Sequence, residues 1–161
     1  MTSFELPSDS CVDILPATWR DLNALKRLEK TCFEKDAWPI WDLMGVLIFP
    51  SVVRLKAVVE GEMVGFIAGH ERDSKKLAWI VTFAVLPAYR RQGIGSALLA
   101  ECESRMGFPV FRLSVRRSNR GAQELYKKFG YRVVGVWPNY YVGKEDALVL
   151  EKKMNNSPYD D

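Results

Sequence analysis

The first pattern along the chain is a stripe of apolar residues at three- and four-residue spacings between positions 17 and 33. Its members are Trp19, Leu22, Leu25, Leu28 and Cys32. This spacing predicts an amphipathic helix, and Thr18 is a suitable N-cap residue for it. A short strand is predicted before this helix, over 12–15, and a second helix after it, over 39–49, with Pro39 in its first turn.

Runs rich in β-branched and aromatic residues follow. The runs over 52–59 and 63–70 flank Glu60-Gly61-Glu62, and such a short connection containing glycine is typical of a β-hairpin. The run over 77–86 is almost continuously hydrophobic, which predicts a central strand buried on both faces. The periodicity then predicts a helix, a strand, a helix and two strands, over 93–106, 110–115, 119–129, 131–137 and 147–153. Together these elements predict a mixed α/β (α+β) fold.

Length and composition narrow the class of protein. A length of 161 residues predicts a single domain, 1–161, with a core over about 12–153 and loose ends. No apolar run approaches the roughly 20 residues of a membrane span, and no signal peptide is visible, so we expect a soluble cytoplasmic protein without a membrane partner. A net charge of +3 is too small to indicate nucleic acid, and the three scattered cysteines indicate reduced thiols and no metal site.

The segment from Val81 to Leu99 carries the candidate chemistry. A buried strand is followed by Pro87, two arginines, Gly93-Ile94-Gly95 and a helix. A helix N-terminus presents N–H groups without partners and a partial positive charge, so a pyrophosphate binds well there. The glycines remove Cβ atoms that would hold a phosphate away. The segment predicts an anion-binding loop; the alternative is a simple turn at Gly93 beside solvated arginines.

This loop resembles that of the GNAT superfamily of acyl-CoA-dependent N-acetyltransferases. The family pattern Gln/Arg-x-x-Gly-x-Gly/Ala is met by Arg90, Gly93 and Gly95 after Ala84-Val85-Leu86-Pro87. Val115-Arg116-Arg117-Ser118-Asn119 and the positions up to Tyr131 are similar to the family's later strand, helix and strand. The resemblance implies the GNAT fold, with a mixed, mostly antiparallel sheet of about seven strands and about four helices. It also implies acetyl-CoA as cosubstrate.

The resemblance implies a role for each matching position. The positions that would bind acetyl-CoA are Phe83, Ala84 and Val85 on the strand and Arg90, Arg91, Gln92, Gly93, Ile94, Gly95 and Ser96 in the loop. Asn119 matches a further position that contacts the cofactor, and asparagine is equally suited to cap the following helix. Tyr126 matches the tyrosine that protonates the departing thiolate, for which a phenol with a pKa near ~10 is suitable. The alternative for Tyr126 is packing in the core.

The general base stays unassigned. Ser114 stands where the RimI-type Nα-acetyltransferases of this superfamily have a glutamate, and Glu34, Glu71, Asp73 and His70 are weaker candidates. An α-amino group has a pKa of about 7.7 to 8.0, so roughly a tenth of it is already neutral at pH 7. Loss of a strong base is therefore more tolerable for an N-terminal amine than for a lysine side chain.

The acceptor is the least defined part of the prediction. Asn139-Tyr140-Tyr141 is similar to the RimI-type Nα-acetyltransferases, which modify protein N-termini. The positions that would contact this acceptor are Phe33, Trp38, Tyr140 and Tyr141, whereas Trp41 is better explained by ordinary packing. A small amine is an alternative acceptor, since this fold serves many of them. A CoA-binding sensor without turnover is a third interpretation, because the glutamate is missing.

Overall fold

The computed structural model describes residues 2–7, 10–73 and 76–154. The strands of this part form one sheet in the order β1-β2-β3-β4-β5-β6-β8-β7. Contacts divide the chain into two compact units, Met1–Gly69 with Thr82–Met106 (unit 1) and His70–Val81 with Gly107–Asp161 (unit 2). The sheet agrees with the mixed α/β architecture expected from the sequence, with eight strands among the described residues in place of about seven.

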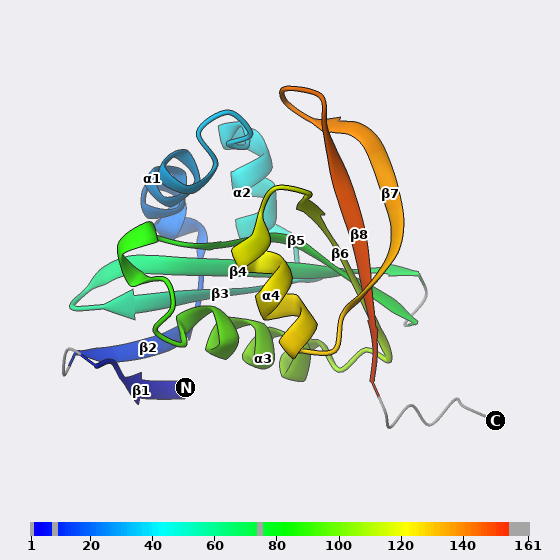
Figure 1. Cartoon of the computed structure of the whole chain (residues 1–161). Coiled ribbons are helices and arrows are strands. Elements are labelled where there is room, and N and C mark those ends of the chain that lie inside the picture. Colours follow the sequence, from blue (N-terminus) through cyan, green and yellow to red (C-terminus); the bar gives the residue numbers. More distant parts are fainter. Residues whose placement is uncertain (1, 8–9, 74–75, 155–161) are drawn as a thin grey trace. The chain divides into compact units, whose positions relative to one another are not determined.

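Unit 1 holds the first strands and three of the α-helices. The elements in chain order are β1 Thr2–Glu5, β2 Cys11–Pro16, the 3-10 turn η1 Trp19–Asp21, α1 Leu22–Phe33, α2 Ile40–Ile48, β3 Val52–Val59, the part of β4 Glu62–Asp73 up to Gly69, the end of β5 Leu77–Val85, the 3-10 turn η2 Pro87–Tyr89 and α3 Ile94–Met106. Figure 1 shows α1 and α2 over one face of these strands and α3 over the other. The hairpin prediction is confirmed, because Glu60 and Gly61 both have positive φ and join β3 to β4 in a two-residue turn.

The extra strand is β1, Thr2–Glu5, which occupies part of the segment 1–10 that is expected to be loose. Thr2 pairs with Ile14 and Glu5 with Cys11 in an antiparallel register. Its side chains alternate between half-buried and exposed, as in an edge strand. The expected loose C-terminal end, 155–161, lies outside the described residues.

The start of the first helix is also corrected. Trp19 does not belong to the buried stripe: it lies in η1, and 61% of its surface is exposed. Thr18 caps this 3-10 turn, and its backbone N–H donates to the Asp21 carboxylate at 2.8 Å. α1 begins only at Leu22, and it buries Leu25 and Leu28 as expected.

The core of unit 1 is packed closely between the sheet and α3. A Cβ atom built on Gly65 of β4 would lie 2.9 Å from Cδ1 of Leu98 and 3.3 Å from the backbone oxygen of Ala84. Glycine at this position therefore lets α3 approach the strands. The largest fully buried side chains of this unit include Ile14, Leu25, Leu28, Leu43, Leu47, Leu55, Phe66, Ile67, Ile94, Leu98 and Leu99.

Unit 2 is built on the C-terminal strands. Its elements are the end of β4 from His70, the start of β5, β6 Val110–Arg116, α4 Arg120–Lys128, β7 Arg132–Tyr141 and β8 Glu145–Lys153. β6 runs parallel to β5 from Leu77↔Val110 to Trp79↔Arg112, and antiparallel to β8 along its whole length. β7 extends to Tyr141, beyond the expected end at 137, because the register between Trp137 and Tyr141 is irregular and accommodates Pro138. None of the described helices is long and apolar enough to span a membrane.

Candidate active site

The loop between η2 and α3 has the backbone that an anion site requires. Arg91 and Gly93 have φ of 63° and 86°, so the chain turns through two left-handed residues before the helix begins. The first helical hydrogen bond runs from the Ala97 N–H to the Gly93 oxygen at 3.0 Å, which leaves the earlier N–H groups of the turn without partners inside the helix. The loop therefore fits a pyrophosphate at the N-terminus of α3.

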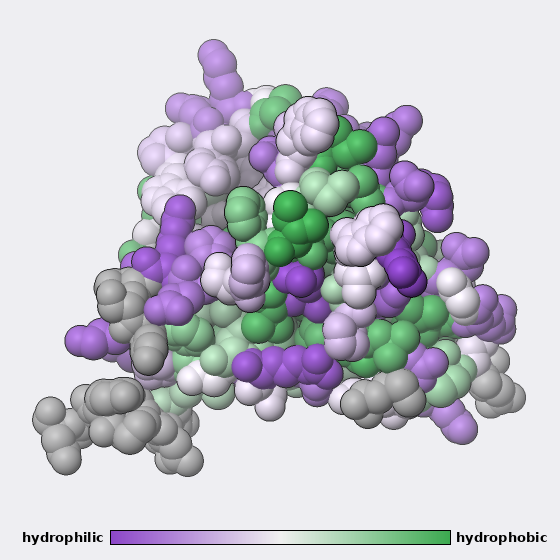
Figure 2. Space-filling model, turned by 180° about the vertical axis from the view of Figure 1, so that it is seen from behind, coloured by the Kyte–Doolittle hydropathy of each residue, from purple (hydrophilic) through white to green (hydrophobic). Residues whose placement is uncertain are grey.

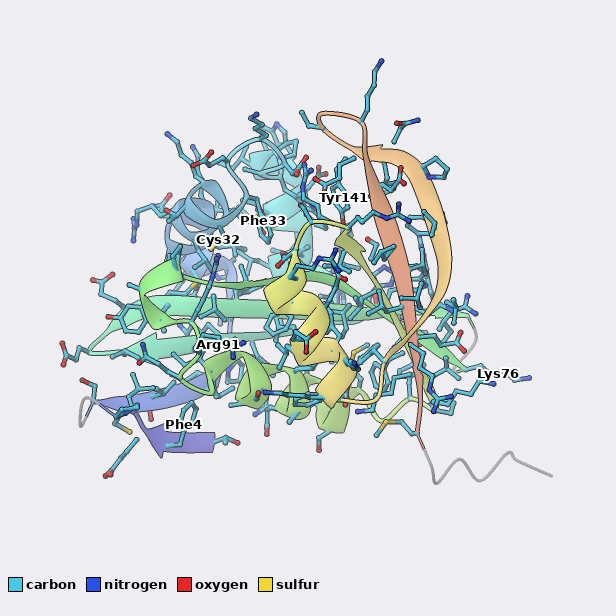
Figure 3. The ribbon with its side chains drawn as sticks, viewed as in Figure 1. Phe4, Cys32, Phe33, Lys76, Arg91 and Tyr141 are labelled. Atoms are coloured by element: carbon cyan, nitrogen blue, oxygen red, sulfur yellow. The ribbon has the colours of Figure 1, made fainter. Side chains whose placement is uncertain are left out.

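Gln92 and Phe4 connect this loop to neighbouring elements. The Gln92 amide donates to the Ala88 oxygen at 3.1 Å and ties the loop to η2. A Cβ atom built on Gly93 would lie 3.8 Å from Cε2 of Phe4, in β1. Figure 3 shows Phe4 below the loop that carries Arg91. The need for glycine at position 93 comes from its φ and not from crowding.

The two loop arginines do different things. Nε of Arg90 donates a 2.8 Å hydrogen bond to the backbone oxygen of Val85, at the end of β5. Arg90 thus ties the loop to the end of β5, and a contact between Arg90 and the cofactor stays a prediction. Both arginines are exposed, and Arg91 is the nearer of the two in sequence to the N-terminus of α3.

The Val85 oxygen has a second neighbour, the thiol of Cys32 at the end of α1, at 3.6 Å. Burial raises the pKa of this thiol, and the Arg90 guanidinium acts in the opposite direction. A neutral thiol is a poor nucleophile. Its position beside β5 therefore does not make Cys32 an acyl carrier.

A buried carboxyl on the same helix was missed by the sequence reasoning. Glu29 is 1% exposed, and its Oε1 accepts a 2.8 Å hydrogen bond from the Thr82 hydroxyl of β5. Burial raises its pKa, while the Thr82 hydroxyl and the backbone of Trp38 act against that rise. A signal was present, because Glu29 lies four residues after Leu25 and three before Cys32, on the apolar stripe of α1.

The aromatic residues expected to contact the acceptor differ in exposure within unit 1. Phe33 and Trp38 are half-buried around the end of α1. Trp41 is not packed in a core, contrary to expectation: it lies on α2 and is 81% exposed. Hydrophobic side chains reach the surface in the upper part of the molecule, where α2 lies (Figure 2). The exposed large hydrophobic residues of this helix and its end are Ile40, Trp41, Ile48 and Phe49.

Tyr126 lies inside unit 2, on α4. The residue is 6% exposed, and its ring packs against that of Tyr131 at a centroid distance of 5.7 Å. Burial is the main cause that raises its pKa, and Tyr141 adds to the rise. The phenol therefore stays protonated at neutral pH, as an acid that donates to a thiolate must be.

Asn119 is the N-cap of α4. Its Oδ1 accepts a 3.2 Å hydrogen bond from the Ala122 N–H. The capping interpretation is thus confirmed. A contact between Asn119 and the cofactor stays a prediction.

The two tyrosines near the end of β7 belong to a row of four aromatic rings in unit 2. Trp79 stacks on Trp137 at 5.7 Å, Tyr140 follows at 5.1 Å from Trp137, and Tyr141 meets Tyr140 edge-on at 5.0 Å. The Tyr141 hydroxyl lies 3.4 Å from the Ser114 hydroxyl. Ser114, at the expected glutamate position, therefore has an acceptor-side candidate as its neighbour.

The weaker proton-acceptor candidates are Glu34, Glu71, Asp73 and His70. Glu34 and Glu71 are exposed, and the Asp73 side chain lies outside the described residues. Nδ1 of His70 donates to the backbone oxygen of Glu71 at 2.6 Å. Over residues 2–7, 10–73 and 76–154, no group of His, Cys, Asp or Glu side chains could hold a metal ion.

The chain is similar to known proteins in both sequence and fold. Residues 16–131 match the model of the acetyltransferase (GNAT) family. An uncharacterized N-acetyltransferase of Methanocaldococcus jannaschii is 32% identical over 149 residues, which cover 86% of this chain and 89% of that protein. N-alpha-acetyltransferase 50 of Danio rerio is 28% identical over 162 residues, with 90% of each chain covered. The structure of Arabidopsis thaliana NAA60 in complex with acetyl-CoA has the same fold, with a TM-score of 0.80 and 22% identity over 90% of this chain and 99% of that one.

Proposed function

The chain belongs to the acetyltransferase (GNAT) family, and we propose that this N-acetyltransferase moves an acetyl group from acetyl-CoA to the α-amino group of a protein or peptide N-terminus. The observation that carries the acetyl-CoA part is the pair of left-handed residues, Arg91 and Gly93, at the N-terminus of α3. Similarity to an N-alpha-acetyltransferase over 90% of both chains supports the acceptor class.

The cosubstrate would lie along the residues that precede and begin α3. The first N–H groups of the helix, from Gly93 to Ser96, would bind the pyrophosphate, and Arg91 would add positive charge. The backbone of Phe83, Ala84 and Val85 would bind the pantetheine arm and the thioester. Arg90, through its bond to the Val85 oxygen, would keep that backbone in place.

The chemistry would be a direct transfer. The neutral amine attacks the thioester carbon, the C–N bond forms, and the C–S bond breaks. The Val85 N–H would polarise the carbonyl, and the Tyr126 hydroxyl would give its proton to the departing thiolate. The ammonium proton passes to solvent, and solvent returns a proton to Tyr126, so that atoms and charge balance.

An N-terminal amine suits a site without a strong base. Ser114 and Tyr141 place two hydroxyl groups 3.4 Å apart, and neither is a base at neutral pH. Since about a tenth of an α-amino group is neutral at pH 7, the reaction would proceed from that fraction. Turnover should therefore rise with pH up to the pKa of the acceptor amine.

The test is release of free CoA thiol from acetyl-CoA in the presence of matched peptides. One peptide has a free N-terminus and no lysine, and its partner has a blocked N-terminus and one lysine. Thiol release with only the first peptide supports the proposal. Release with only the second peptide or with only small amines overturns the acceptor class, and tight CoA binding without release for any amine overturns acetyl transfer.

A further inference from the structure

Tyr141 is held on three sides within unit 2. Tyr140 meets its ring edge-on, Ser114 lies beside its hydroxyl, and the Arg116 guanidinium lies over its face, 4.6 Å from the ring centroid. The face of a phenol ring attracts a cation, and a planar guanidinium also stacks on it. Arg116 therefore fixes the plane of the ring that the proposed function assigns to the acceptor.

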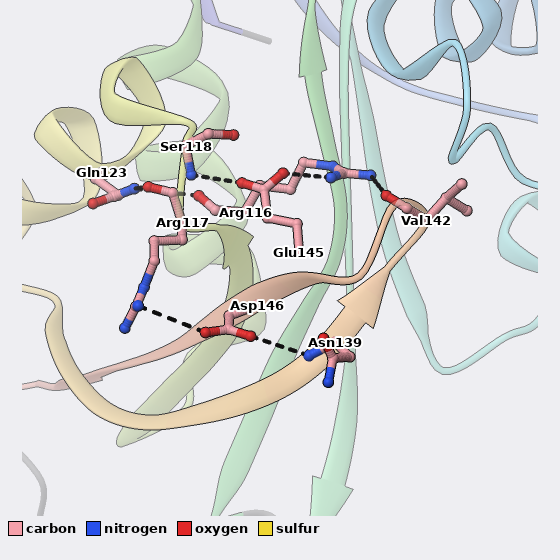
Figure 4. A network of polar contacts seen from close by, with 8 residues as sticks. All are labelled: Arg116, Arg117, Ser118, Gln123, Asn139, Val142, Glu145 and Asp146. Carbon is pink, nitrogen blue, oxygen red and sulfur yellow. Dashed lines mark hydrogen bonds and ion pairs between the residues drawn. The ribbon is translucent and has the colours of Figure 1, made fainter.

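The guanidinium of Arg116 is itself held firmly. Nη1 of Arg116 donates to Oε2 of Glu145 at 2.6 Å, and Nη2 donates to the Val142 oxygen at 3.2 Å. The other oxygen of Glu145 accepts from the Ser118 N–H at 2.7 Å. Figure 4 shows this network running from the turn before α4 to the turn between β7 and β8.

The turn that carries Tyr141 depends on such support. β7 is an edge strand in the sheet order, and most of its residues are exposed. After Tyr141 the chain turns through Gly143 and Lys144, both with positive φ. An exposed strand end of this kind would otherwise sample several arrangements, and ordering it on binding costs free energy.

We propose that Arg116 is a positioning residue for the acceptor: through Glu145 and Val142 it fixes the β7–β8 turn, and through its own face it fixes the Tyr141 ring beside Ser114. The proposal rests on the proposed function for the identity of the acceptor. The same network starts at Ser118, next to Asn119, so the support for the acceptor turn comes from the cap of α4.

Lysine would not replace arginine here. The guanidinium uses two N–H groups on two acceptors and its flat face on a third group at the same time. An ammonium is a point charge without a stacking face. Arg116→Lys should therefore recover only part of what Arg116→Ala loses.

The adjacent Arg117 provides a matched control. Its side chain is 59% exposed and lies 3.6 Å from Asp146. This ion pair is longer and more exposed to solvent than the pair of Arg116 with Glu145. Arg117→Ala removes the same charge from the residue after β6 and removes no contact with the Tyr141 ring, while Asp146 keeps the hydrogen bond that it accepts from the Asn139 N–H at 3.1 Å. Glu145→Gln provides a second way to loosen Arg116 with little change in shape.

The experiment measures kcat and KM for an acceptor peptide, CoA affinity by calorimetry, and the ring signals of ¹³C-labelled tyrosine, with Tyr141→Phe assigning the signal. For Arg116→Ala we expect KM for the peptide to rise about tenfold, kcat and CoA affinity to change less than about twofold, and the Tyr141 signal to shift or broaden. Glu145→Gln should change the KM for the peptide and the Tyr141 signal in the same direction as Arg116→Ala, but by less. Arg117→Ala should behave as the wild type.

Two results would overturn the proposal. One is an Arg116→Ala variant that matches Arg117→Ala in KM and in the Tyr141 signal. The other is an equal loss of kcat, KM and CoA affinity, which would mark Arg116 as a general structural residue. If the wild type acetylates only small amines, the proposed acceptor class fails, while the Tyr141 signal and the KM for that amine still decide the role of Arg116.

Discussion

The Thr82 hydroxyl satisfies only one oxygen of the Glu29 carboxyl: it donates to Oε1 at 2.8 Å, and Oε2 has no hydrogen-bond partner among the described residues. A buried carboxylate with an unpaired oxygen is costly in free energy. Desolvation by burial raises the pKa of Glu29 above 4.5, and the Thr82 hydroxyl and the Trp38 backbone offset only part of this rise. The folded protein therefore favours the protonated form of Glu29 more than the unfolded chain does.

The stability of the protein should consequently depend on pH through Glu29. Below pH 4.5 the folded and unfolded states both hold the proton, and the stabilising effect is fully present. As the pH rises through the folded pKa, the free energy of unfolding falls by about 1.4 kcal/mol for each unit by which the pKa is raised. Glu29→Gln removes this dependence.

Urea unfolding of wild type and Glu29→Gln between pH 4 and pH 8 measures this effect. The wild type should lose stability relative to the variant as the pH rises. A difference between the two proteins that stays constant over this range would contradict the role of Glu29.

Glu145 should give the opposite pH dependence of stability, with its contribution lost at low pH. Hydrogen bonds from Ser118, and then the Arg116 guanidinium, lower the pKa of Glu145 from 4.5 to about 2. Its stabilising contribution is therefore present above pH 4.5 and is lost as the pH falls toward about 2. In unfolding experiments from pH 7 to pH 2, the difference between wild type and Glu145→Gln should shrink only in the acidic part. A difference that is already lost near pH 6 would mean that Glu145 is not held by these donors.

Gly107, which follows α3, provides a matched control for Gly93 in the anion loop. Both have positive φ, 86° and 64°, and a Cβ atom would find nothing closer than 3.8 Å at Gly93 and nothing within 4 Å at Gly107. Alanine at either position should cost roughly 1–2 kcal/mol of stability, because both must hold a left-handed backbone. Only Gly93→Ala should also weaken CoA binding, measured by calorimetry. Equal CoA affinity in the two variants would remove Gly93 from the cofactor site.

Tyr126→Phe tests the proposed acid. The variant keeps the ring against Tyr131 and loses only the hydroxyl, so we expect kcat to fall about hundredfold with CoA affinity unchanged. Because burial raises the pKa of Tyr126, the wild type should show no loss of kcat between pH 7 and 9 from ionisation of this phenol. Unchanged turnover in the variant would exclude Tyr126 from proton transfer.

Most of the fold could be predicted because its patterns are local. The stripe on α1, the glycine turn after Val59 and the continuous apolar run of β5 each depend on neighbours in sequence. β1 could not be predicted, because its polar residues become a strand only by pairing with β2. Trp19 was assigned to the buried stripe because spacing alone does not show that a 3-10 turn precedes the helix.

In the candidate site, too, features that are contiguous in the sequence could be predicted, and contacts between distant residues could not. The loop from Arg90 to Ser96 was visible because its glycines and its helix are contiguous in the chain. Two partners of Arg116, Val142 and Glu145, are 26 and 29 residues away, so the residues next to Arg116 in the sequence do not indicate them. Likewise, Glu29 meets Thr82 across 53 residues. Interactions of this range become visible only when the strands are in register.

The first strand gives the anion loop an unexpected dependence on the beginning of the chain. Phe4 lies beneath Gly93, and the Thr2 hydroxyl donates to Glu101 on α3 at 3.0 Å. The helix that would hold the pyrophosphate is thus supported at two points by a segment made some ninety residues earlier. An N-terminal fusion or trimming that appears harmless from the polar sequence would remove these contacts of the anion loop and α3, and a protein altered there would be a misleading sample for measuring CoA affinity.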